Sequence, residues 1–343
     1  MSQIMELTIQ ELTNKIKGMI IGSIGAFDDI RLKGICAVDN YLNGYITFVK
    51  NDKWATHLEK VTHAVIIIPS ALAYLAEKYP GNLYIVVNNT AIAMMNLQEL
   101  FYSNKPIIHI QGISTRAIIG SDCQIGKEVI VADNVYIGDN VIIDDNVTIL
   151  PNTCIMDNVK IGSGTFVYSS VTIYHNCIVG KDCLIQAGAL IGVEGFRIEQ
   201  DNEKKTVRKM IHIGNVEIGN NVEIGGNDTI ARATLEKEST IIADDVKLDG
   251  LVHIGHNAKI GARTTIAALT CIGGSSRIGE EVWIGTGVNI SNGVIVGNKA
   301  KILLNAIVAR DVLENEMVSG FYAMPHRQWV KVWQHLKDIS QGR

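Results

Sequence analysis

The 343-residue sequence lacks several features that mark other classes of protein. It has no cluster of Lys and Arg, and its formal net charge of -4 and pI near 6.1 argue against a nucleic-acid-binding surface. The N-terminus lacks a charged and then apolar signal pattern. The longest apolar run, residues 64–76, is short and interrupted by Pro69, so no membrane span is predicted. We therefore expect a cytoplasmic protein.

The six cysteines lack the spacing that is typical of metal sites or of a disulfide framework. Cys123, Cys177 and Cys183 fall at positions of a repeat, described next, where small side chains recur. Buried thiols of this kind act as small apolar groups, so we expect them to pack in a core. The sequence predicts no metal site and no permanently bound cofactor.

An Ile, Val or Leu recurs at every sixth residue through most of the last two-thirds of the chain. The first run extends from Ile113 to Ile191 without a miss, and the second from Ile218 to Val308 with only Glu236 out of register. A period of six is neither helical nor a simple strand alternation. Each unit is therefore expected to be a short strand and a corner, stacked as a solenoid.

Small residues four places after each aliphatic support this geometry, because large side chains would not fit there. Gly, Asp and Asn occupy the expected corners, where they tolerate tight or left-handed backbone. Examples are Gly120, Gly126, Asn134, Gly138 and Asn140. The pattern resembles the hexapeptide-repeat family, which implies a left-handed parallel β-helix with three units to a coil. The left hand follows from the resemblance, since ordinary parallel crossovers are right-handed.

Residues 1–105 show no six-residue repeat and are expected to form a small α/β domain. Thr8 and Glu11 have the spacing of a capping box at a helix start. Three apolar runs are predicted as strands: Tyr45–Val49, Ala64–Pro69 and Leu83–Val87. Pro106 lies near the expected boundary.

The β-helix is predicted over residues 106–312, with an inserted loop at about 193–212. Ile191 and Ile218 are 27 residues apart, which is not a multiple of six, so the repeat loses register there. Because the regular faces of a solenoid are needed for stacking, such a loop is a place where function is expected. Residues 313–343 form a helical tail in this interpretation, since apolar side chains recur there at helical spacing.

Residues 248–257 contain His253 and His256, and this string resembles the UDP-3-O-acylglucosamine N-acyltransferase family of lipid A assembly. The resemblance implies that His256 is the general base and that Asp249, seven residues earlier, orients it. An amine that attacks a thioester must lose a proton, which a neutral imidazole can accept near neutral pH. His253 precedes an inward Ile and is expected to point outward, as part of the substrate site.

The N-terminal domain resembles the same family at Phe48, Asn51 and Trp54, where two aromatics bracket a uracil and an Asn assists. Trp54 stands in place of the family's Tyr, which retains a π-face but loses the hydroxyl. The alternative is an aromatic pair that fills the core of the small domain. Phe196 and Arg232 are the other residues that the resemblance places at the substrate.

The resemblance covers nearly the whole chain, including the tail at residues 319–325, but this sequence departs from the family at three places. Gly293 stands where the family has a second histidine, and Ala231 stands where it has an acid. The tail is also short. A residue without a side chain cannot replace a hydrogen-bonding imidazole, so the lipid substrate and the carrier-protein donor remain open.

The sequence is therefore interpreted as an N-acyltransferase acting on a nucleotide-linked amino sugar, with a phosphopantetheine thioester as donor. Two versions remain open: a lipid A enzyme acting on a UDP sugar, and a relative acylating a dTDP-linked 4-amino-4,6-dideoxyhexose from acyl-coenzyme A. The donor is either acyl-coenzyme A or an acyl carrier protein. A corner such as Gly273-Gly274 is a candidate oxyanion donor. The resemblance implies a homotrimer with active sites in the clefts between prisms.

Two interpretations from other classes also remain. A γ-type carbonic anhydrase uses the same prism with three zinc-bound histidines, for which His212, His253 and His256 are the candidates. Their spacing does not match that family, and the N-terminal domain would be unexplained. A non-catalytic scaffold would leave Asp249 and His256 without a role.

Overall fold

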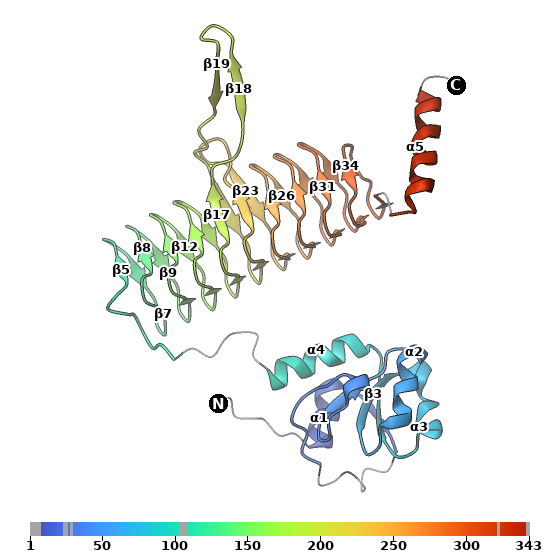
Figure 1. The fold of residues 1–343 in the computed structure, drawn as a ribbon. Helices are drawn as coiled ribbons and strands as arrows, with labels where there is room; N and C mark the ends of the chain where they lie inside the picture. The colour runs from blue at the N-terminus through green and yellow to red at the C-terminus, as the bar shows by residue number, and fades with distance from the viewer. Residues whose placement is uncertain (1–7, 23–26, 28–29, 103–108, 321–322, 341–343) are drawn as a thin grey trace. The chain divides into compact units, whose positions relative to one another are not determined.

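The computed structural model describes residues 8–22, 27, 30–102, 109–320 and 323–340 (Figure 1). The chain divides into two compact units, residues 1–108 and residues 109–343. Pro106, and Phe321 and Tyr322 of the predicted tail, lie outside the described residues.

The N-terminal unit contains a four-stranded sheet of order β1-β4-β3-β2. Strands β2, β3 and β4 are parallel, and β1 pairs with β4 in the antiparallel sense. The strands are β1 (Met19–Ile21), β2 (Ile46–Phe48), β3 (Val65–Pro69) and β4 (Leu83–Val87). The α-helices are α1 (Ile9–Ile16), α2 (Asp52–Ala55), α3 (Leu75–Lys78) and α4 (Thr90–Phe101), with 3-10 turns at Val38–Asn40, Thr56–Lys60 and Ser70–Leu72.

The predicted helix start and the three predicted strands of this unit are present. Thr8 and Glu11 form the reciprocal capping box at α1, in which the Thr8 side chain accepts from the Glu11 amide. Strand β1 was not predicted from the sequence. It is only three residues long and is stabilised by pairing with β4, which lies far away in the chain.

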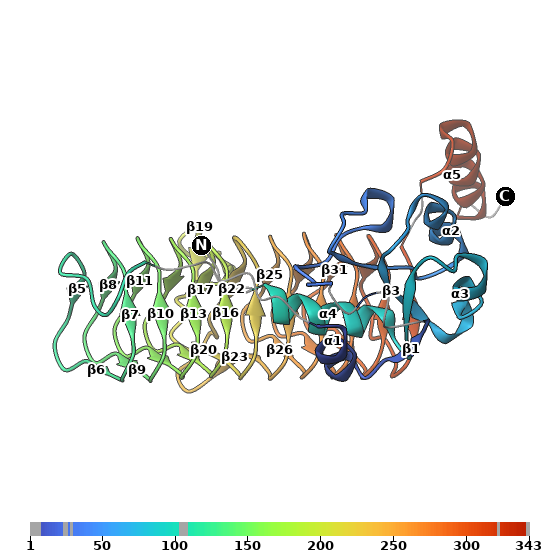
Figure 2. The same cartoon turned by 90° about the horizontal axis from the view of Figure 1, so that it is seen from below.

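The second unit is a parallel β-helix built from three sheets of ten, ten and nine strands, here called sheets 1, 2 and 3 (Figures 1 and 2). Sheet 1 contains β7 (Ile130–Val131), β10 (Thr148–Ile149), β13 (Phe166–Val167), β16 (Leu184–Ile185), β21 (Glu223–Ile224), β24 (Lys247–Leu248), β27 (Thr265–Ile266), β30 (Trp283–Ile284), β33 (Lys301–Ile302) and β35 (Met317–Val318). Sheet 2 contains β5 (Ile118–Ile119), β8 (Tyr136–Ile137), β11 (Cys154–Ile155), β14 (Thr172–Ile173), β17 (Leu190–Val193), β22 (Thr229–Ala231), β25 (His253–Ile254), β28 (Cys271–Ile272), β31 (Asn289–Ile290) and β34 (Ile307–Val308). Sheet 3 contains β6 (Gln124–Ile125), β9 (Ile142–Ile143), β12 (Lys160–Ile161), β15 (Ile178–Val179), β20 (Asn215–Ile218), β23 (Ser239–Ile242), β26 (Lys259–Ile260), β29 (Arg277–Ile278) and β32 (Ile295–Val296).

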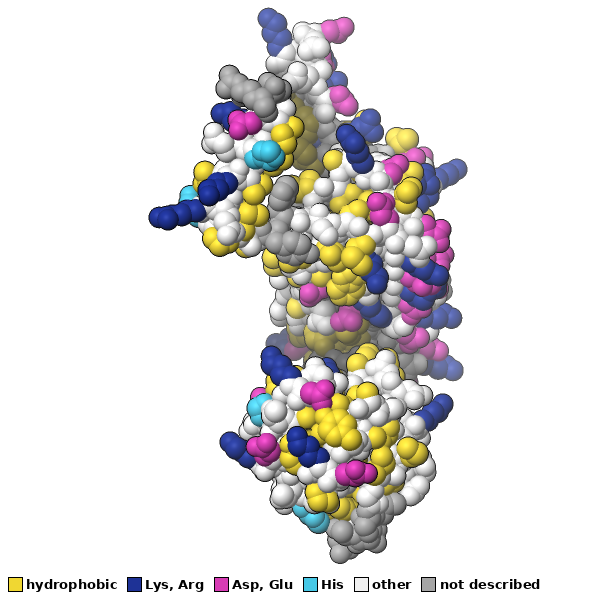
Figure 3. Space-filling model, turned by 90° about the vertical axis from the view of Figure 1, so that its right-hand side faces the viewer, with side chains coloured by type: hydrophobic (Ala, Val, Ile, Leu, Met, Phe, Trp, Pro, Cys, Tyr) yellow, Lys and Arg dark blue, Asp and Glu magenta, His cyan; other side chains and the backbone are white. Residues whose placement is uncertain are grey.

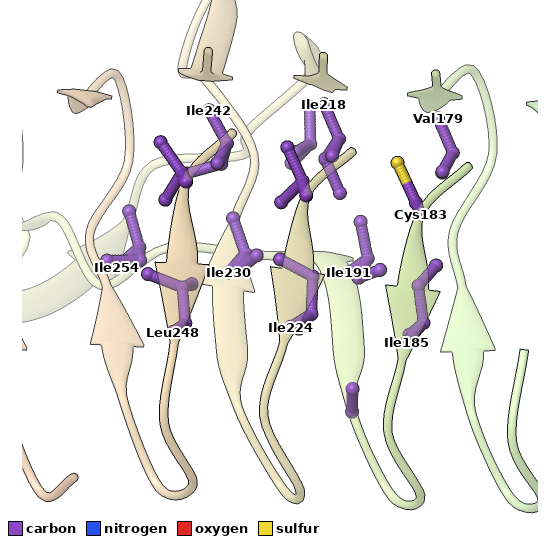
Figure 4. Packing of buried hydrophobic residues seen from close by; sticks show 14 of the residues in the cluster. Val179, Cys183, Ile185, Ile191, Ile218, Ile224, Ile230, Ile242, Leu248 and Ile254 are labelled. Atoms are coloured by element: carbon purple, nitrogen blue, oxygen red, sulfur yellow. The ribbon is translucent and has the colours of Figure 1, made fainter. Parts of the chain in front are cut away.

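The aliphatic residue of each repeat points into the β-helix, which explains the six-residue period. Figure 4 shows side chains such as Ile185, Ile191, Ile224 and Ile230 packed in the interior between the sheets. All four are fully buried. Because burial of apolar area is the main favourable term in folding, the strict repeat of aliphatic residues specifies this core.

The corners show left-handed backbone at asparagine and a close approach of successive coils at glycine. Asn134 and Asn140 have φ of 59° and 57°, the left-handed conformation that Asn tolerates. Gly120 does not have a positive φ. A Cβ at Gly120 would lie 2.6 Å from the carbonyl carbon of Gly138 in the next coil. Glycine is therefore needed there for the close approach of successive coils.

Two insertions leave the β-helix in successive coils, and both join sheet 2 to sheet 3. The first, residues 194–214 between β17 and β20, was predicted as a loop and contains an antiparallel hairpin of β18 (Ile198–Asp201) and β19 (Thr206–Lys209) (Figure 1). The second, residues 232–238 between β22 and β23, includes Glu236. Glu236 is therefore not a repeat residue out of register, but part of an insertion that lengthens its coil.

The β-helix extends beyond the predicted end at residue 312, since β35 pairs with β33. Helix α5 (His326–Ser340) follows, and its apolar residues Trp329, Trp333 and Leu336 are exposed. Figure 3 shows hydrophobic side chains at the surface among charged ones. In the part of the chain that the structure describes, no helix has the length and apolar character to cross a membrane.

Candidate active site

The two insertions and His256 lie at the same corner of the β-helix, the turn from sheet 2 to sheet 3. His256 follows β25 and is half-buried. Its Nδ1 lies 3.0 Å from Oδ1 of Asn257. Since a carbonyl oxygen only accepts, Nδ1 is the donor and Nε2 has the lone pair. Among the described residues no group hydrogen-bonds to Nε2, and a Cβ at Gly274 would lie 2.7 Å from this nitrogen.

Asn257 is held by groups from the second insertion. Its Nδ2 donates to Oε2 of Glu238 at 2.7 Å, and its Oδ1 accepts from the amide and the hydroxyl of Thr234, each at 3.1 Å. These contacts fix the orientation of the side-chain amide. The carboxylate of Glu238 thus acts on His256 through Asn257.

Asp249 and His256 lie at different corners of one chain. Asp249 lies at the other end of β25, at the corner from sheet 1 to sheet 2. Its carboxylate accepts from the amides of Gly250 at 2.8 Å and Ala268 at 3.3 Å. It lines a hollow of about 720 Å³ that also includes Trp283. Within one chain, Nδ1 of His256 is therefore bound by Asn257 rather than by Asp249, and a role for Asp249 in orienting the base remains a prediction.

Arg232 is buried and joins neighbouring segments of the β-helix. Only 2% of it is exposed. Its guanidinium donates to the carbonyl of Gly192 at 2.7 Å, and to Nε2 and the carbonyl of His175 at 2.6 and 3.0 Å. Burial, and then the charge of Arg232, hold the pKa of His175 below its usual value. These three hydrogen bonds hold the coil where the first insertion begins, and a role for Arg232 in binding substrate remains a prediction.

His212 comes from the first insertion and contacts His256. The two imidazole rings meet edge to face, with centroids 5.2 Å apart. His212 is 3% exposed, and its Nδ1 donates to the carbonyl of Met210 at 3.0 Å. Burial lowers the pKa of His212. The sequence suggested His212 only as a zinc ligand, but within the described ranges no three His, Cys, Asp or Glu side chains are grouped to hold a metal ion.

The predicted oxyanion corner is already occupied by internal hydrogen bonds. The amide of Gly273 donates to the carbonyl of Ile290, and the amide of Gly274 donates to Oδ1 of Asn292, both at 2.8 Å. These two amides are therefore not free to bind an oxyanion in this structure, and that prediction is wrong. Gly293, in place of the family's histidine, has a φ of 73°, and no described atom lies within 4 Å of the position that a Cβ would occupy there.

Phe196 and His253 lie on the surface. Phe196 is 84% exposed in the first insertion, next to Gly195, which packs against His212. His253 is the outward residue of β25, as predicted. A role for either in binding substrate remains a prediction.

Comparisons with known proteins show which chains are similar to this one. UDP-3-O-acylglucosamine N-acyltransferase of Methylacidiphilum infernorum (isolate V4) is 43% identical over 245 residues, which are 71% of this chain and 66% of that protein. The protein of the same name from Chlorobium chlorochromatii (strain CaD3) is 45% identical over 249 residues, 72% of this chain and 67% of its own length. The chain belongs to the UDP-3-O-acylglucosamine N-acyltransferase family.

The match spans about two thirds of the length of these relatives. The sequence model of a family described as GMPPB C-terminal domain matches residues 113–200. The solved structure of Arabidopsis UDP-N-acetylglucosamine acyltransferase superposes with a TM-score of 0.52 at 23% identity, over 61% of this chain and 71% of that one, which supports the fold alone. The predicted family and the left-handed parallel β-helix are confirmed.

In this family member, Phe48, Asn51 and Trp54 lie together in sequence at the junction of β2 and α2. Phe48 ends β2 and is half-buried, and Asn51 caps the backbone of α2 without a side-chain hydrogen bond. Trp54 is 39% exposed and tilts against His57 at 5.6 Å. An exposed indole does not fit the alternative that both aromatics fill the core. Base stacking by these residues remains a prediction.

Sequence reasoning missed Asn257, Glu238 and Thr234 as a group. Two signals point to them: the break after Ile191 and the irregular Glu236 each mark an insertion. Three repeats make one coil, so every third repeat lies on the same sheet. Counting in this way assigns both insertions to strands of sheet 2, at the same corner as His256.

Proposed function

We propose that this chain transfers an acyl group from a phosphopantetheine thioester to the amine of a nucleotide-linked amino sugar. The observation that supports this most is the state of His256, whose Nδ1–H is bound by Asn257 while Nε2 has no hydrogen-bond partner among the described residues. A neutral imidazole in this tautomer is a suitable general base.

In the proposed reaction the amine nitrogen attacks the thioester carbonyl carbon. Nε2 of His256 accepts the proton that the amine loses, a C–N bond forms and the C–S bond breaks. The thiolate leaves and takes the proton from His256, so the products are an amide and a free thiol. Glu238, acting through Asn257, stabilises the positive charge that His256 gains during the step.

The names of the relatives favour a UDP-linked, 3-O-acylated glucosamine as the acceptor. A dTDP-linked 4-amino-4,6-dideoxyhexose is the alternative, because Gly293 replaces a family histidine. Phe48, Asn51 and Trp54 would hold the base of either nucleotide. Acyl-coenzyme A is the favoured donor: helix α5 offers Arg327, Lys331 and Lys337 against Asp338, which is a thin basic surface for an acidic carrier protein.

We also propose a homotrimer in the cytoplasm. Sheet 2 lies between the corners of Asp249 and His256. Its outer face has exposed apolar side chains at Ile118, Tyr136 and Ile307. A second copy covering them would remove apolar surface from water. In such a trimer the cleft between copies is the place for the substrate.

The test is an assay of the purified chain with acyl-coenzyme A or acyl carrier protein and a panel of UDP- and dTDP-linked amino sugars, with amide product detected by mass spectrometry. Each amino sugar is matched by the sugar in which a hydroxyl replaces the amine. We expect one amino sugar to be acylated at least a hundredfold faster than its matched control, on the order of 3 kcal/mol in transition-state binding. No amide from any sugar and either donor would refute the proposed function.

A further inference from the structure

His212 has a buried nitrogen that the rest of the described structure leaves without a partner. Its Nδ1–H donates to the carbonyl of Met210, so Nε2 has the lone pair. Nε2 is buried and no described group hydrogen-bonds to it. Such unsatisfied buried acceptors are rare in folded proteins, and each one calls for an explanation in terms of function or strain.

This nitrogen lies near His256, under the backbone of Gly195, and not at the surface. A Cβ placed on Gly195 would lie 2.7 Å from Nε2 of His212 and 3.0 Å from Cβ of His256. One point in space is therefore close to both residues, and Gly195 allows the backbone to cover it. Because this backbone covers Nε2, a substrate does not reach the nitrogen directly. Any effect of His212 on the reaction passes through His256.

One carboxylate and one ammonium group lie close to His212, and they pair with each other. The carboxylate of Glu194 accepts from the His212 amide at 3.4 Å and from Nζ of Lys209 at 2.7 Å. Glu238 faces His256 only through Asn257. On the side of the first insertion, the group that contacts the ring of His256 is therefore the imidazole of His212.

We propose that His212 is a positioning residue that holds the ring of His256 and, through its Nε2 lone pair, stabilises the imidazolium that His256 becomes when it accepts the amine proton. This inference rests on the proposed function of His256. Electrostatic groups that are fixed before the reaction stabilise developing charge without reorganisation. His212 stays neutral in this role, since burial lowers its pKa and the charge of a protonated His256 lowers it further.

The test compares His212→Leu, which removes the lone pair, with His212→Gln, which supplies a side-chain oxygen as acceptor. In the leucine variant we expect kcat to fall about tenfold and the acid limb of the kcat/KM profile to move about one unit to lower pH. The KM values of sugar and donor should change by less than about twofold, because His212 does not touch them. The glutamine variant should restore most of kcat and the position of the limb.

An NMR titration of histidine-labelled protein separates this inference from the proposed function, because it needs no turnover. We expect His256 to titrate at lower pH in the leucine variant than in the wild type, and His212 to keep its proton on Nδ1 throughout. If the leucine variant does not fold, the wild-type protein alone still shows whether His212 keeps its proton on Nδ1. An unchanged titration of His256, or a proton on Nε2 of His212, would overturn the inference. Equal losses of kcat in both variants would also overturn it, by indicating a purely structural role.

Discussion

Asn257 is the residue on which the proposed site depends most. It follows His256, adopts the left-handed corner conformation with φ of 60°, and joins the base to Glu238. Corner asparagines elsewhere in the β-helix have the same backbone without these contacts. Asparagine thus allows the left-handed backbone at many corners of the β-helix. At this corner its side chain also binds His256 and Glu238.

Asn257→Ala should lower kcat about ten- to a hundredfold and leave the KM of the amino sugar nearly unchanged. The imidazole loses the acceptor that fixes its tautomer, a cost of about 1–3 kcal/mol for an unpaired polar group. Steady-state kinetics measure the effect. Asn140→Ala is the matched control, because it imposes the same left-handed strain, about 1–2 kcal/mol, at a remote corner with φ of 57°. Equal losses of kcat in the two variants would mean that only the fold is affected.

Asp228 is a buried carboxyl at a position where other repeats have a small side chain. It accepts from the amides of Gly225 and Val252, both at 2.7 Å. Burial raises its pKa to about 7 despite these two bonds, and the charge of Asp249 adds to the rise. Asp228 thus links the corner of Asp249 to the preceding coil.

This raised pKa predicts a specific dependence of stability on pH. At a pH below 3.8, the ordinary pKa of Asp and the value taken for the unfolded chain, Asp228 is protonated in both the folded and the unfolded state. Between this pH and about 7, the unfolded chain has released the proton while the folded chain still holds it. The free energy of unfolding should therefore fall as pH rises toward 7, by about 1.4 kcal/mol per unit at most. Urea unfolding of wild type and Asp228→Asn should show this fall in the wild type only. Parallel pH dependence of the two proteins would contradict the assignment.

At the scale of elements, the sequence predicts what is local and repeated. The six-residue period predicts the strands because each aliphatic residue enters the same core, and the capping box of Thr8 and Glu11 predicts a helix start from four residues. The insertions are not repeated, so their contacts could not be predicted. Asn257 meets Glu238 across 19 residues of sequence, and only the lengthened coil brings the two together.

The resemblance to the family predicted His256 as the base, but it could not predict the contacts that Asp249 and Arg232 make in this chain. A spacing of seven residues on a β-helix spans one whole side, so Asp249 and His256 occupy different corners of one chain. Arg232 is adjacent to Ala231, where the family has an acid. Its guanidinium instead donates to His175 and Gly192, contacts that no local pattern reveals.

The junction of β2 and α2 gives a prediction for nucleotide binding. Trp54→Ala should raise the KM for the nucleotide sugar about five- to a hundredfold, since stacking of a base on an aromatic side chain contributes about 1–3 kcal/mol. Trp54→Tyr is the matched control and should retain most of the affinity, because it keeps a π-face. Calorimetric titration with the free nucleotide measures both variants. Unchanged affinity in the alanine variant would place the base elsewhere.

At the scale of the whole molecule, a regular β-helix supports His256, and the two insertions place His212 against His256 and Glu238 against Asn257. Both insertions join sheet 2 to sheet 3, and the next corner of that kind contains His256. A site built on such a support is held with little freedom, which favours catalysis by positioned groups. The central claim is therefore that this one corner is where acyl transfer takes place.

The most direct test is the turnover of His256→Ala with the best amino sugar and donor, at saturating concentrations of both. A positioned general base contributes about 10²- to 10⁴-fold, so kcat should fall by that factor. His335→Ala, at an exposed position of helix α5, is the matched control and should keep the kcat of the wild type. The unfolding midpoint and the oligomeric mass of both variants should match those of the wild type. Near-normal turnover of a folded His256→Ala variant would contradict the account.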